Sequence, residues 1–341
     1  MTGKKHLLGL TLDELKEVSL ECGLPKFAAK QIADWIYKKR VSSIDEMTNI
    51  SLTNRQLLSQ KYDVGRYTPS EFQKSTDGTV KYLFKTENDK LIETVMIPDK
   101  ERMTLCVSSQ VGCKLNCLFC MTGKQGFDGN LTANEILNQI YSVEEAEELT
   151  NVVFMGMGEP LDNYGELKKV LDIMTAEYGM AWSPKRITVS TTGITPKLKQ
   201  FLDESSAHLA VSIHSPFSEQ RASIMPVEKA YPIEDILDLL REYDWRGQRR
   251  LSFEYIMFDN FNDSAEHSTK LAQLLRGLDC RINLIRFHAI PNVNLKTSTR
   301  EKMESFRDYL NKKGFLCTIR SSRGEDISAA CGMLSTEKSK K

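Results

Sequence analysis

Residues 113–120 read Cys113-Lys-Leu-Asn-Cys117-Leu-Phe-Cys120, directly after an apolar run from Met103 to Val107 and a short polar stretch. The spacing CxxxCxxC places three thiolates in one short loop, and clustered thiolates are the usual ligands of iron–sulfur clusters. Such a cluster normally takes four cysteines, so three of them leave one iron without a protein ligand. The stretch therefore predicts a [4Fe-4S] cluster with one open coordination position.

An open iron on a reducing cluster is what S-adenosylmethionine (SAM) requires if its amino and carboxylate groups are to chelate the metal. Reductive cleavage of SAM to a radical is chemistry that cofactors perform and side chains do not. Two other readings of the cysteines remain. A structural zinc site would need a fourth ligand, and no second CxxC or HxxxH pair follows. Structural disulfides would need an oxidising compartment. The sequence shows no secretory signal, so this interpretation is disfavoured.

The length of 341 residues allows one large domain and one small domain. Lysine plus arginine and aspartate plus glutamate number 46 each, so net charge gives no argument for a nucleic-acid partner, although it permits a local basic patch. No run of about 18 apolar residues occurs, so we expect no membrane span. The amino-terminal residues lack the apolar core of a signal peptide, which predicts a cytoplasmic protein.

The first part of the chain has a helical pattern. Thr11 and Glu14 form a capping box ahead of apolar residues at near-helical spacing, and a second helix from Lys26 to Tyr37 leads into a basic triplet. From residue 67 to 97 the apolar period changes towards two, which indicates antiparallel strands. We expect a small accessory domain over residues 1–90. The residues alone leave open whether it binds a polyanion or only caps the next domain.

Residues 91–341 alternate between strand-like and helix-like patterns, and we expect them to form the main domain. After the run at 103–107, the strand-like stretches are 151–157, 186–190, 208–213, 251–257, 281–285 and 315–319, and the helix-like stretches between them are 131–147, 166–176, 196–202, 233–243, 266–278 and 300–313. Such alternation gives parallel strands with right-handed crossovers. No glycine-rich dinucleotide fingerprint follows the first strand, so we predict an α/β fold with a partial or full barrel rather than an open sheet, and with its functional groups at the carboxyl ends of the strands.

Polar residues occur where these strands are expected to end. Gly158 and Glu159 follow the second strand, where glycine lets the backbone approach a ligand and a carboxylate can accept from an ammonium group. An ordinary turn explains them equally well. Ser190 and Ser212 end the next two strands with hydroxyls that can reach a ribose or a carboxylate. His214 fits a ligand contact or a buried core histidine, and taken alone the core role is favoured.

Together these motifs resemble one family, the RlmN and Cfr radical SAM methyltransferases. The matching stretches are Leu105-Cys106-Val-Ser-Ser-Gln-Val-Gly-Cys113, Cys120-Met-Thr-Gly, Met155-Gly-Met-Gly-Glu-Pro160, Ser212-Ile-His214 and Asp326-Ile-Ser-Ala-Ala-Cys331-Gly. They span nearly all of the chain from Glu93 onwards. The resemblance implies a partial (β/α)6 radical SAM barrel that uses the cluster and two SAM molecules per turnover. Its implied substrate is an adenosine of 23S ribosomal RNA and, in some members, a tRNA adenosine beside the anticodon.

The resemblance also implies roles for individual residues. Cys331 matches the thiol that first accepts a methyl group, Cys106 matches the thiol that releases the product through a transient disulfide, and Glu93 matches the proposed general base. Taken alone, both cysteines would more often be small buried residues. The implied SAM contacts are Gly158, Glu159, Ser190, Ser212, Ile213, His214 and His288. Many members have an asparagine in place of His288, whose imidazole can still offer one donor or acceptor.

The position of methylation divides the family, because RlmN acts on carbon 2 of adenine and Cfr on carbon 8. Pro160 after Gly-Glu favours RlmN, whereas the stretch from Ser212 to Arg221 is nearer to Cfr. A carbon-8 methyltransferase therefore remains an alternative, as does a radical SAM enzyme that acts on a substrate other than RNA.

The partners follow from the same resemblance. It implies that the accessory domain binds RNA, that a reducing donor such as flavodoxin supplies electrons, and that the enzyme works as a monomer without membrane contact. The candidate phosphate contacts are Arg246, Arg249, Arg250, Arg320 and Arg323. An ordinary solvated face is an equal alternative for these arginines.

Overall fold

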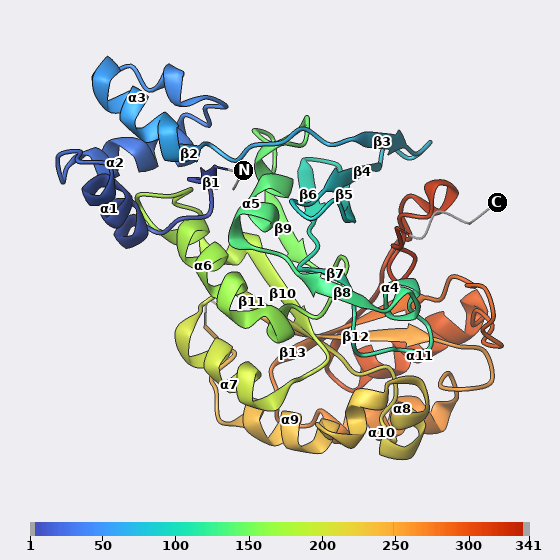
Figure 1. The fold of residues 1–341 in the computed structure, drawn as a ribbon. Coiled ribbons are helices and arrows are strands. Elements are labelled where there is room, and N and C mark those ends of the chain that lie inside the picture. Colours follow the sequence, from blue (N-terminus) through green and yellow to red (C-terminus); the bar gives the residue numbers. More distant parts are fainter. Residues whose placement is uncertain (1–3, 248, 337–341) are drawn as a thin grey trace.

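The computed structural model describes residues 4–247 and 249–336, which form a large α/β part and a smaller helical part (Figure 1). A ten-stranded sheet runs through the large part in the order β14-β13-β12-β11-β10-β9-β6-β5-β4-β3. The parallel strands are β6 (Arg102–Cys106), β9 (Asn151–Phe154), β10 (Ile187–Thr191), β11 (His208–Ser212), β12 (Leu251–Met257), β13 (Cys280–Arg286) and β14 (Leu316–Ile319).

Helices alternate with these strands and cover the sheet. They are α5 (Ala133–Tyr141), α6 (Tyr164–Thr175), α7 (Thr195–Glu204), α8 (Ser218–Ile224), α9 (Ile233–Arg241), α10 (Ala265–Leu274) and α11 (Arg300–Lys312). The predicted α/β class and the parallel order are confirmed. The sheet does not close on itself, since β14 pairs only with β13 among the described residues, so it forms a partial barrel. Its seven described parallel strands correspond to the seven strand-like stretches of the sequence. None of the described helices is long and apolar enough to cross a bilayer.

Three antiparallel strands extend the sheet beyond β6. They are β5 (Leu91–Asp99), β4 (Val80–Lys85) and β3 (Glu71–Lys74). In β4 the apolar residues Val80, Tyr82 and Phe84 are buried while their neighbours are not, which is the period of two that the sequence predicted. These strands belong to the same sheet as the barrel, although the expected accessory domain extends to residue 90.

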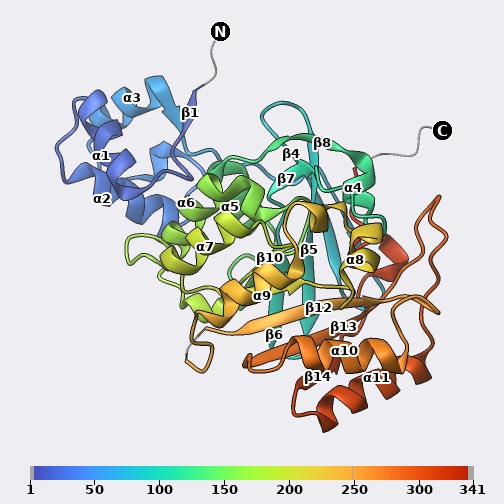
Figure 2. The same ribbon diagram turned by 90° about the horizontal axis from the view of Figure 1, so that it is seen from below.

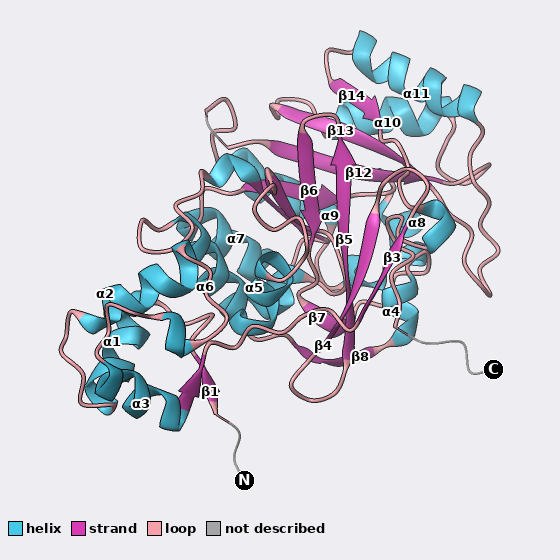
Figure 3. Cartoon of the chain, turned by 90° about the horizontal axis from the view of Figure 1, so that it is seen from above, coloured by secondary structure: helices cyan, strands magenta, loops and turns pink. Residues whose placement is uncertain are grey.

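The helical part lies on one side of the barrel, against α5 and α6, as Figures 2 and 3 show from opposite directions. It contains β1 (Lys5–His6), α1 (Leu12–Glu21), α2 (Ala28–Ala33), α3 (Leu52–Lys61) and β2 (Tyr62–Asp63). The predicted capping box is present, because Thr11 accepts from the Glu14 amide and the Glu14 carboxylate accepts from the Thr11 amide. This cap fixes the start of α1.

Hydrogen bonds from α5 hold the helical part in place. The buried side-chain amide of Asn134 donates to the carbonyls of Leu8 at 3.1 Å and Gly65 at 2.9 Å. The Tyr141 hydroxyl donates to the carbonyl of Tyr37 at 3.0 Å. Asn134 thus bonds backbone near both ends of the helical part and Tyr141 bonds backbone in its middle, so the two parts pack as neighbours with defined polar contacts.

The carboxyl-terminal segment returns to the cysteine loop. The Met121 amide, at the start of α4 (Met121–Gln125), donates to the Gly332 carbonyl at 2.8 Å. The Thr122 hydroxyl donates to the carbonyl of Leu334 at 2.7 Å. Figure 1 shows this segment, in red, close to α4. The last described residues of the chain thereby cover the loop that carries the three predicted cluster ligands.

Candidate active site

The three cysteines of the CxxxCxxC loop line one cavity of about 150 Å³, which we call the cluster-side cavity. The loop leaves the short strand β7 (Gln110–Gly112) and ends at α4. The Cys120 amide donates to the Cys117 carbonyl at 3.2 Å, which closes a turn and brings these two residues to the same side. The cavity lies where β9, β10 and β11 end, as expected for a barrel of parallel strands.

The electrostatics of this loop suit a cationic metal cluster. Burial raises the pKa of the Cys113 thiol to about 12 and raises that of Cys117 further, and the thiols raise one another's pKa as well. Three buried thiolates would therefore be unstable without positive charge beside them, and iron supplies that charge. Among the described residues, no three His, Cys, Asp or Glu side chains are grouped to hold a single metal ion. The donor set of three soft sulfurs fits the predicted cluster.

Glu159 also lines the cluster-side cavity, and its carboxylate is fixed on both oxygens. One oxygen accepts from the amide of Thr192 at 2.8 Å and from its hydroxyl at 3.0 Å, and the other accepts from the Leu161 amide at 3.1 Å. Burial raises the pKa of Glu159 and these hydrogen bonds oppose that effect. The carboxylate is thus held in one orientation at the wall of the cavity, where it can accept from an ammonium group.

The glycine before it is required by close packing. Gly158 has a φ of +99°, and a Cβ at this position would lie 2.5 Å from Cβ of Gln110. The Gln110 side chain accepts from the Glu159 amide at 2.9 Å. A side chain on Gly158 would push Gln110 away and release the amide of Glu159. The motif is therefore more than an ordinary turn.

Ser190, Ser212 and His214 line the same cavity from the ends of β10 and β11. His214 is buried with a φ of 54°, and its Nδ1 accepts from the Ile256 amide at 2.9 Å. Burial, together with the positive charge of Arg221, lowers the pKa of His214 to about 3, so the ring is neutral. The remaining proton is on Nε2, which can donate to a ligand. Both the core role and the ligand role considered for His214 are therefore compatible with its position.

Two of the expected SAM contacts lie elsewhere. Ile213 is fully buried and does not line the cluster-side cavity, although its backbone amide donates to the carbonyl of Glu254 in β12 at 3.0 Å. His288 lines a second cavity, where its Nε2 is 3.0 Å from the hydroxyl of Ser322. Burial lowers the pKa of this imidazole.

The second cavity, which we call the thiol cavity, has a volume of about 500 Å³ and contains both of the other predicted cysteines. Cys106 is buried at the end of β6, whereas Cys331 is exposed in the carboxyl-terminal segment. The two cavities adjoin, since Cys120, Met155, Arg320 and Cys331 line both of them. Two thiols that are distant in the sequence are thus brought into one space beside the cluster loop.

The two thiols differ in environment. Burial, and after it the nearby thiol of Cys331, raises the pKa of Cys106 to about 12. Arg320 opposes this rise, and its guanidinium pairs with the buried carboxylate of Glu254 at 3.4 Å. All eight cysteines lie in described residues and are free thiols, so the disulfide that the resemblance implied is not present in this structure.

Glu93 is buried in β5 but does not line either cavity. Its carboxylate pairs with Lys81 at 2.9 Å and accepts from the amide of Ser335 at 2.9 Å. Burial raises the pKa of Glu93, and Lys81 opposes that rise. The carboxylate is therefore held by the same segment that carries Cys331, four positions beyond that cysteine.

The five arginines proposed as phosphate contacts fall into different settings. Arg249 donates to the carbonyls of Ala207, Leu202 and Phe201 at 3.0, 2.9 and 3.2 Å, so all three of its guanidinium nitrogens bond backbone at the end of α7 and the start of β11. Arg320 and Arg323 line the thiol cavity. Arg246 is exposed and Arg250 is partly buried.

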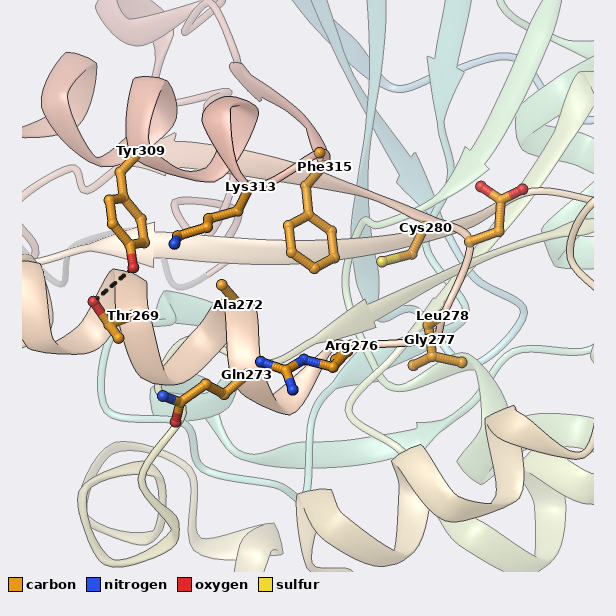
Figure 4. Close-up of a pocket in the computed structure, with 12 residues that line it drawn as sticks. Thr269, Ala272, Gln273, Arg276, Gly277, Leu278, Cys280, Tyr309, Lys313 and Phe315 are labelled. Atoms are coloured by element: carbon orange, nitrogen blue, oxygen red, sulfur yellow. Dashed lines mark hydrogen bonds between the residues drawn. The ribbon is translucent and has the colours of Figure 1, made fainter.

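A further cavity, of about 420 Å³, lies between α10 and α11 (Figure 4). Its wall includes Cys280 at the start of β13 and Phe315 just before β14, so it lies at the amino ends of these strands, whereas the cysteine loop comes after the carboxyl end of β6. Figure 4 shows Arg276 and Lys313 beside it, and the hydrogen bond of 3.0 Å from Thr269 to Tyr309. It is therefore not part of the site.

Several residues of the site were not identified from the sequence. Thr192 fixes Glu159, Glu254 pairs with Arg320, and Arg221 binds the loops after β10 and β11. Thr192 stands in the noted stretch Ser190-Thr-Thr-Gly193, so a polar run at a strand end was an available signal. Neither the spacing nor the composition of the sequence indicated Glu254 or Arg221.

Comparison with known sequence families gives two matches. The Radical SAM superfamily matches residues 107–272, and the family described as "Ribosomal RNA large subunit methyltransferase N-terminal domain" matches residues 5–64. The second match ends where β2 ends, at the close of the helical part.

Comparison with known proteins covers almost the whole chain. A protein of Parabacteroides distasonis named "Probable dual-specificity RNA methyltransferase RlmN" is 64% identical over 338 residues, 99% of this chain and 98% of that one. The "Dual-specificity RNA methyltransferase RlmN" of Syntrophus aciditrophicus is 40% identical over 97% of this chain and 96% of that one. The crystal structure of a radical SAM methyltransferase from Sphaerobacter thermophilus has a TM-score of 0.91 at 39% identity, covering 97% of this chain and 99% of that one.

Proposed function

Since the chain belongs to the RlmN family of radical SAM RNA methyltransferases, we propose that it methylates carbon 2 of a specific adenosine in 23S ribosomal RNA and of a tRNA adenosine beside the anticodon. The observation that carries this proposal is the shared cavity of Cys106 and Cys331, which adjoins the cavity of the three cluster cysteines. A radical SAM enzyme without a covalent cysteine intermediate would not need this pair.

The residues of the cluster-side cavity supply the cofactor sites. Cys113, Cys117 and Cys120 would hold the [4Fe-4S] cluster. When bound, the cluster supplies the electron that cleaves SAM reductively, and the radical so formed removes hydrogen from a methyl group on the protein. The fixed carboxylate of Glu159 and the backbone at Gly158 offer acceptors to the amino group of SAM.

Ser190, Ser212 and His214 complete the proposed SAM site. The hydroxyls can donate to the carboxylate or the ribose, and the neutral imidazole of His214 can donate from Nε2. His214 stays neutral throughout the physiological range because burial lowers its pKa so far.

Cys331 would carry the one-carbon unit to the base. Its exposed thiol can reach both SAM and the thiol cavity because it lines both spaces. The sulfur of Cys331 would take a methyl group from one SAM, and after hydrogen abstraction that carbon would bond to the adenine ring. The adduct would then lose one electron to the bound cluster and the ring proton to a base. The thiolate of Cys106 would attack the sulfur of Cys331, the electron pair of the broken sulfur–carbon bond would remain on the carbon, which takes up a proton to become a methyl group, and the resulting disulfide would be reopened by an external reductant.

Glu93 remains the proposed proton acceptor. Burial raises the pKa of this carboxyl towards the range of a useful general base. Its hydrogen bond from Ser335 connects it to the loop of Cys331, so a movement of that loop would also change the position of Glu93.

The proposed partners follow from the family. The helical part that matches the N-terminal domain of the family would bind RNA, and Arg323 at the thiol cavity would contact a phosphate. An electron donor of the flavodoxin type would reduce the cluster. We propose that the enzyme acts as a monomer in the cytoplasm.

The test is the modification state of RNA in a strain that lacks this gene. Mass spectrometry of nucleosides from its 23S rRNA and tRNA should show loss of 2-methyladenosine, restored by the wild-type gene and not by Cys331→Ala. Appearance of 8-methyladenosine on complementation would identify the carbon-8 alternative. Unchanged methylation in every strain would refute the proposal.

A further inference from the structure

Arg221, in α8, is a fully buried arginine beside the cluster-side cavity. Its Nε donates to the carbonyl of Ile213 at 3.1 Å, and its Nη2 donates to the carbonyls of Thr192 at 2.9 Å and Ser212 at 3.0 Å. Its Nη1 pairs with the carboxylate of Glu228, which is also buried. A single guanidinium thus bonds three backbone carbonyls and one carboxylate.

These carbonyls belong to the two loops that form one wall of the cavity. Thr192 follows β10, and Ser212 ends β11, and both residues line the cavity. Arg221 therefore bridges neighbouring strand ends. Among the side-chain hydrogen bonds of the described residues, those from Arg221 are the only ones that reach the carbonyls of Thr192 and Ser212.

The bridge reaches the carboxylate proposed to hold SAM. The carbonyl of Thr192 accepts from Arg221, while the amide and hydroxyl of the same Thr192 donate to Glu159. A continuous chain of hydrogen bonds therefore runs from the guanidinium to Glu159. A shift of Thr192 would move both of the donors that hold Oε2 of Glu159.

The same helix contacts the cysteine loop. At the end of α8, the carbonyl of Ile224 accepts from the amide of Leu118 at 2.9 Å. Ile224 and Met225 pack in one buried cluster with Cys117 and Phe119. Helix α8 thus has the loop of the cluster ligands on one side and, through Arg221, the SAM-facing wall on the other.

Arginine is suited to this position for a geometric reason. Its planar guanidinium has five N–H donors in fixed directions, whereas lysine has three on one rotating nitrogen. A buried positive charge is costly unless it is paired, and Glu228 supplies the partner. The carboxylate of Glu228 also accepts from the hydroxyl of Ser218 at 2.6 Å and from the amide of Ile233 at 3.1 Å.

We propose that Arg221 is a positioning residue of the SAM site, which fixes the loops after β10 and β11 so that Glu159 and Ser212 present their oxygens to the ligand. The inference rests on the proposed function as a radical SAM enzyme, because it concerns how that cofactor site is built. Arg221 does not line the cluster-side cavity, so it would act through Thr192 and Ser212 and would not touch a reactant itself.

The test compares Arg221→Lys and Arg221→Met with a matched control. Arg249→Met is that control, because Arg249 also bonds three backbone carbonyls but lies at the opposite ends of the strands, near α7. The dissociation constant of SAM is measured by equilibrium dialysis on protein with reconstituted cluster, together with iron content and the melting temperature of the cluster-free chain.

We expect Arg221→Met to raise the dissociation constant of SAM by about tenfold, the equivalent of roughly one lost hydrogen bond. The KM for RNA should change less than the KM for SAM, and Arg221→Lys should fall between Arg221→Met and wild type. Arg249→Met should lower the melting temperature and leave SAM affinity unchanged.

Unchanged SAM affinity in Arg221→Met and Arg221→Lys, at normal iron content, would overturn the inference while leaving the family function intact. If Arg221→Met does not fold, the dissociation constant of SAM for Arg221→Lys, which keeps the positive charge, tests the inference instead. Failure of the wild-type protein to bind SAM at all would instead refute the proposed function.

Discussion

The hydroxyl of Ser75 donates a hydrogen bond of 2.6 Å to the carboxylate of Asp326, which lies 251 positions later in the chain. The amide of Thr76 donates to the other oxygen at 3.1 Å, and these bonds lower the pKa of Asp326. The Asp77 carboxylate accepts from the amide of Gly324 at 3.0 Å. The turn between β3 and β4 therefore holds the loop that leads to Cys331.

Replacing Asp326 by alanine should loosen this loop. With both hydrogen bonds removed, hydrogen exchange of the amides around residues 325–331 should become about fivefold faster, and methyl transfer to RNA should slow by a similar factor. Asp89→Ala, in the exposed turn between β4 and β5, is the matched control. Exchange equal to wild type in Asp326→Ala would show that other contacts hold the loop.

Alanine at any one of Cys113, Cys117 or Cys120 should abolish the cluster. Two remaining thiolates cannot retain it against solvent and oxidant, so SAM cleavage should fall to the background level. Iron analysis, the visible absorption and 5′-deoxyadenosine production measure this outcome. Cys280→Ala serves as the control, because Cys280 is buried at the amino end of β13, away from the cysteine loop. Retained colour in Cys117→Ala would contradict the ligand assignment.

Replacement of the two other thiols should give different products. Cys106→Ala should accept the methyl group on Cys331 and add it to adenine, but it should not release the RNA, because no thiol attacks the sulfur of Cys331. Denaturing gels with labelled RNA should show a covalent adduct with this variant. Cys331→Ala should give neither adduct nor methylated base. Normal release from Cys106→Ala would disprove the role of that thiol.

Neutralising basic residues of the helical part should weaken RNA binding in a salt-dependent way. Lys26 and Lys30 are exposed beside the exposed ring of Phe27. If both contact phosphates, Lys26→Gln with Lys30→Gln should reduce the slope of log affinity against log salt by about 1.4 to 1.8. Filter binding at several salt concentrations measures the slope. Arg276→Gln with Lys313→Gln, at the far cavity, removes the same charge and should leave it unchanged.

His208 should make stability depend on pH. Burial first, and then the positive charges of Arg250 and Arg281, lower the pKa of His208 from 6.5 to about 4. Between these values the unfolded chain binds a proton that the folded chain does not, so this contribution to stability is complete above pH 6.5 and declines as pH falls towards 4. The slope has a ceiling of about 1.4 kcal/mol per pH unit, reduced by solvent screening.

His208→Asn should therefore flatten the stability profile in urea unfolding between pH 4 and 6.5. Asparagine keeps an acceptor for the Arg250 amide, which donates to Nδ1 of His208 at 2.9 Å in the wild type. Identical profiles for the two proteins would mean that His208 is protonated in the folded state.

The local features of the fold were predictable because their signals lie within a few residues. The capping box of Thr11, the bounds of β12 and the three clustered cysteines are all set by short-range spacing. The family resemblance then indicated Cys106 and Cys331, which no local pattern connects. The family assignment and the α/β class were correct for these reasons.

The remaining features depend on contacts between distant segments. Nothing near Arg249 in the sequence indicates that it binds the end of α7, so it was proposed as a phosphate contact. The period of two in β3 and β4 predicted strands but not the sheet that they join. Arg221 and Glu254 are ordinary charged residues until the fold buries them, since burial is a property of the whole packing.

The contacts of Gly332 and Leu334 with α4 have a consequence for how the protein is made in the cell. A ribosome releases the cysteine loop some two hundred residues before it releases the segment that covers it. Because a domain folds as a unit, the covering segment cannot pack on α4 before it has been synthesised, and the three thiols lack that cover throughout the interval.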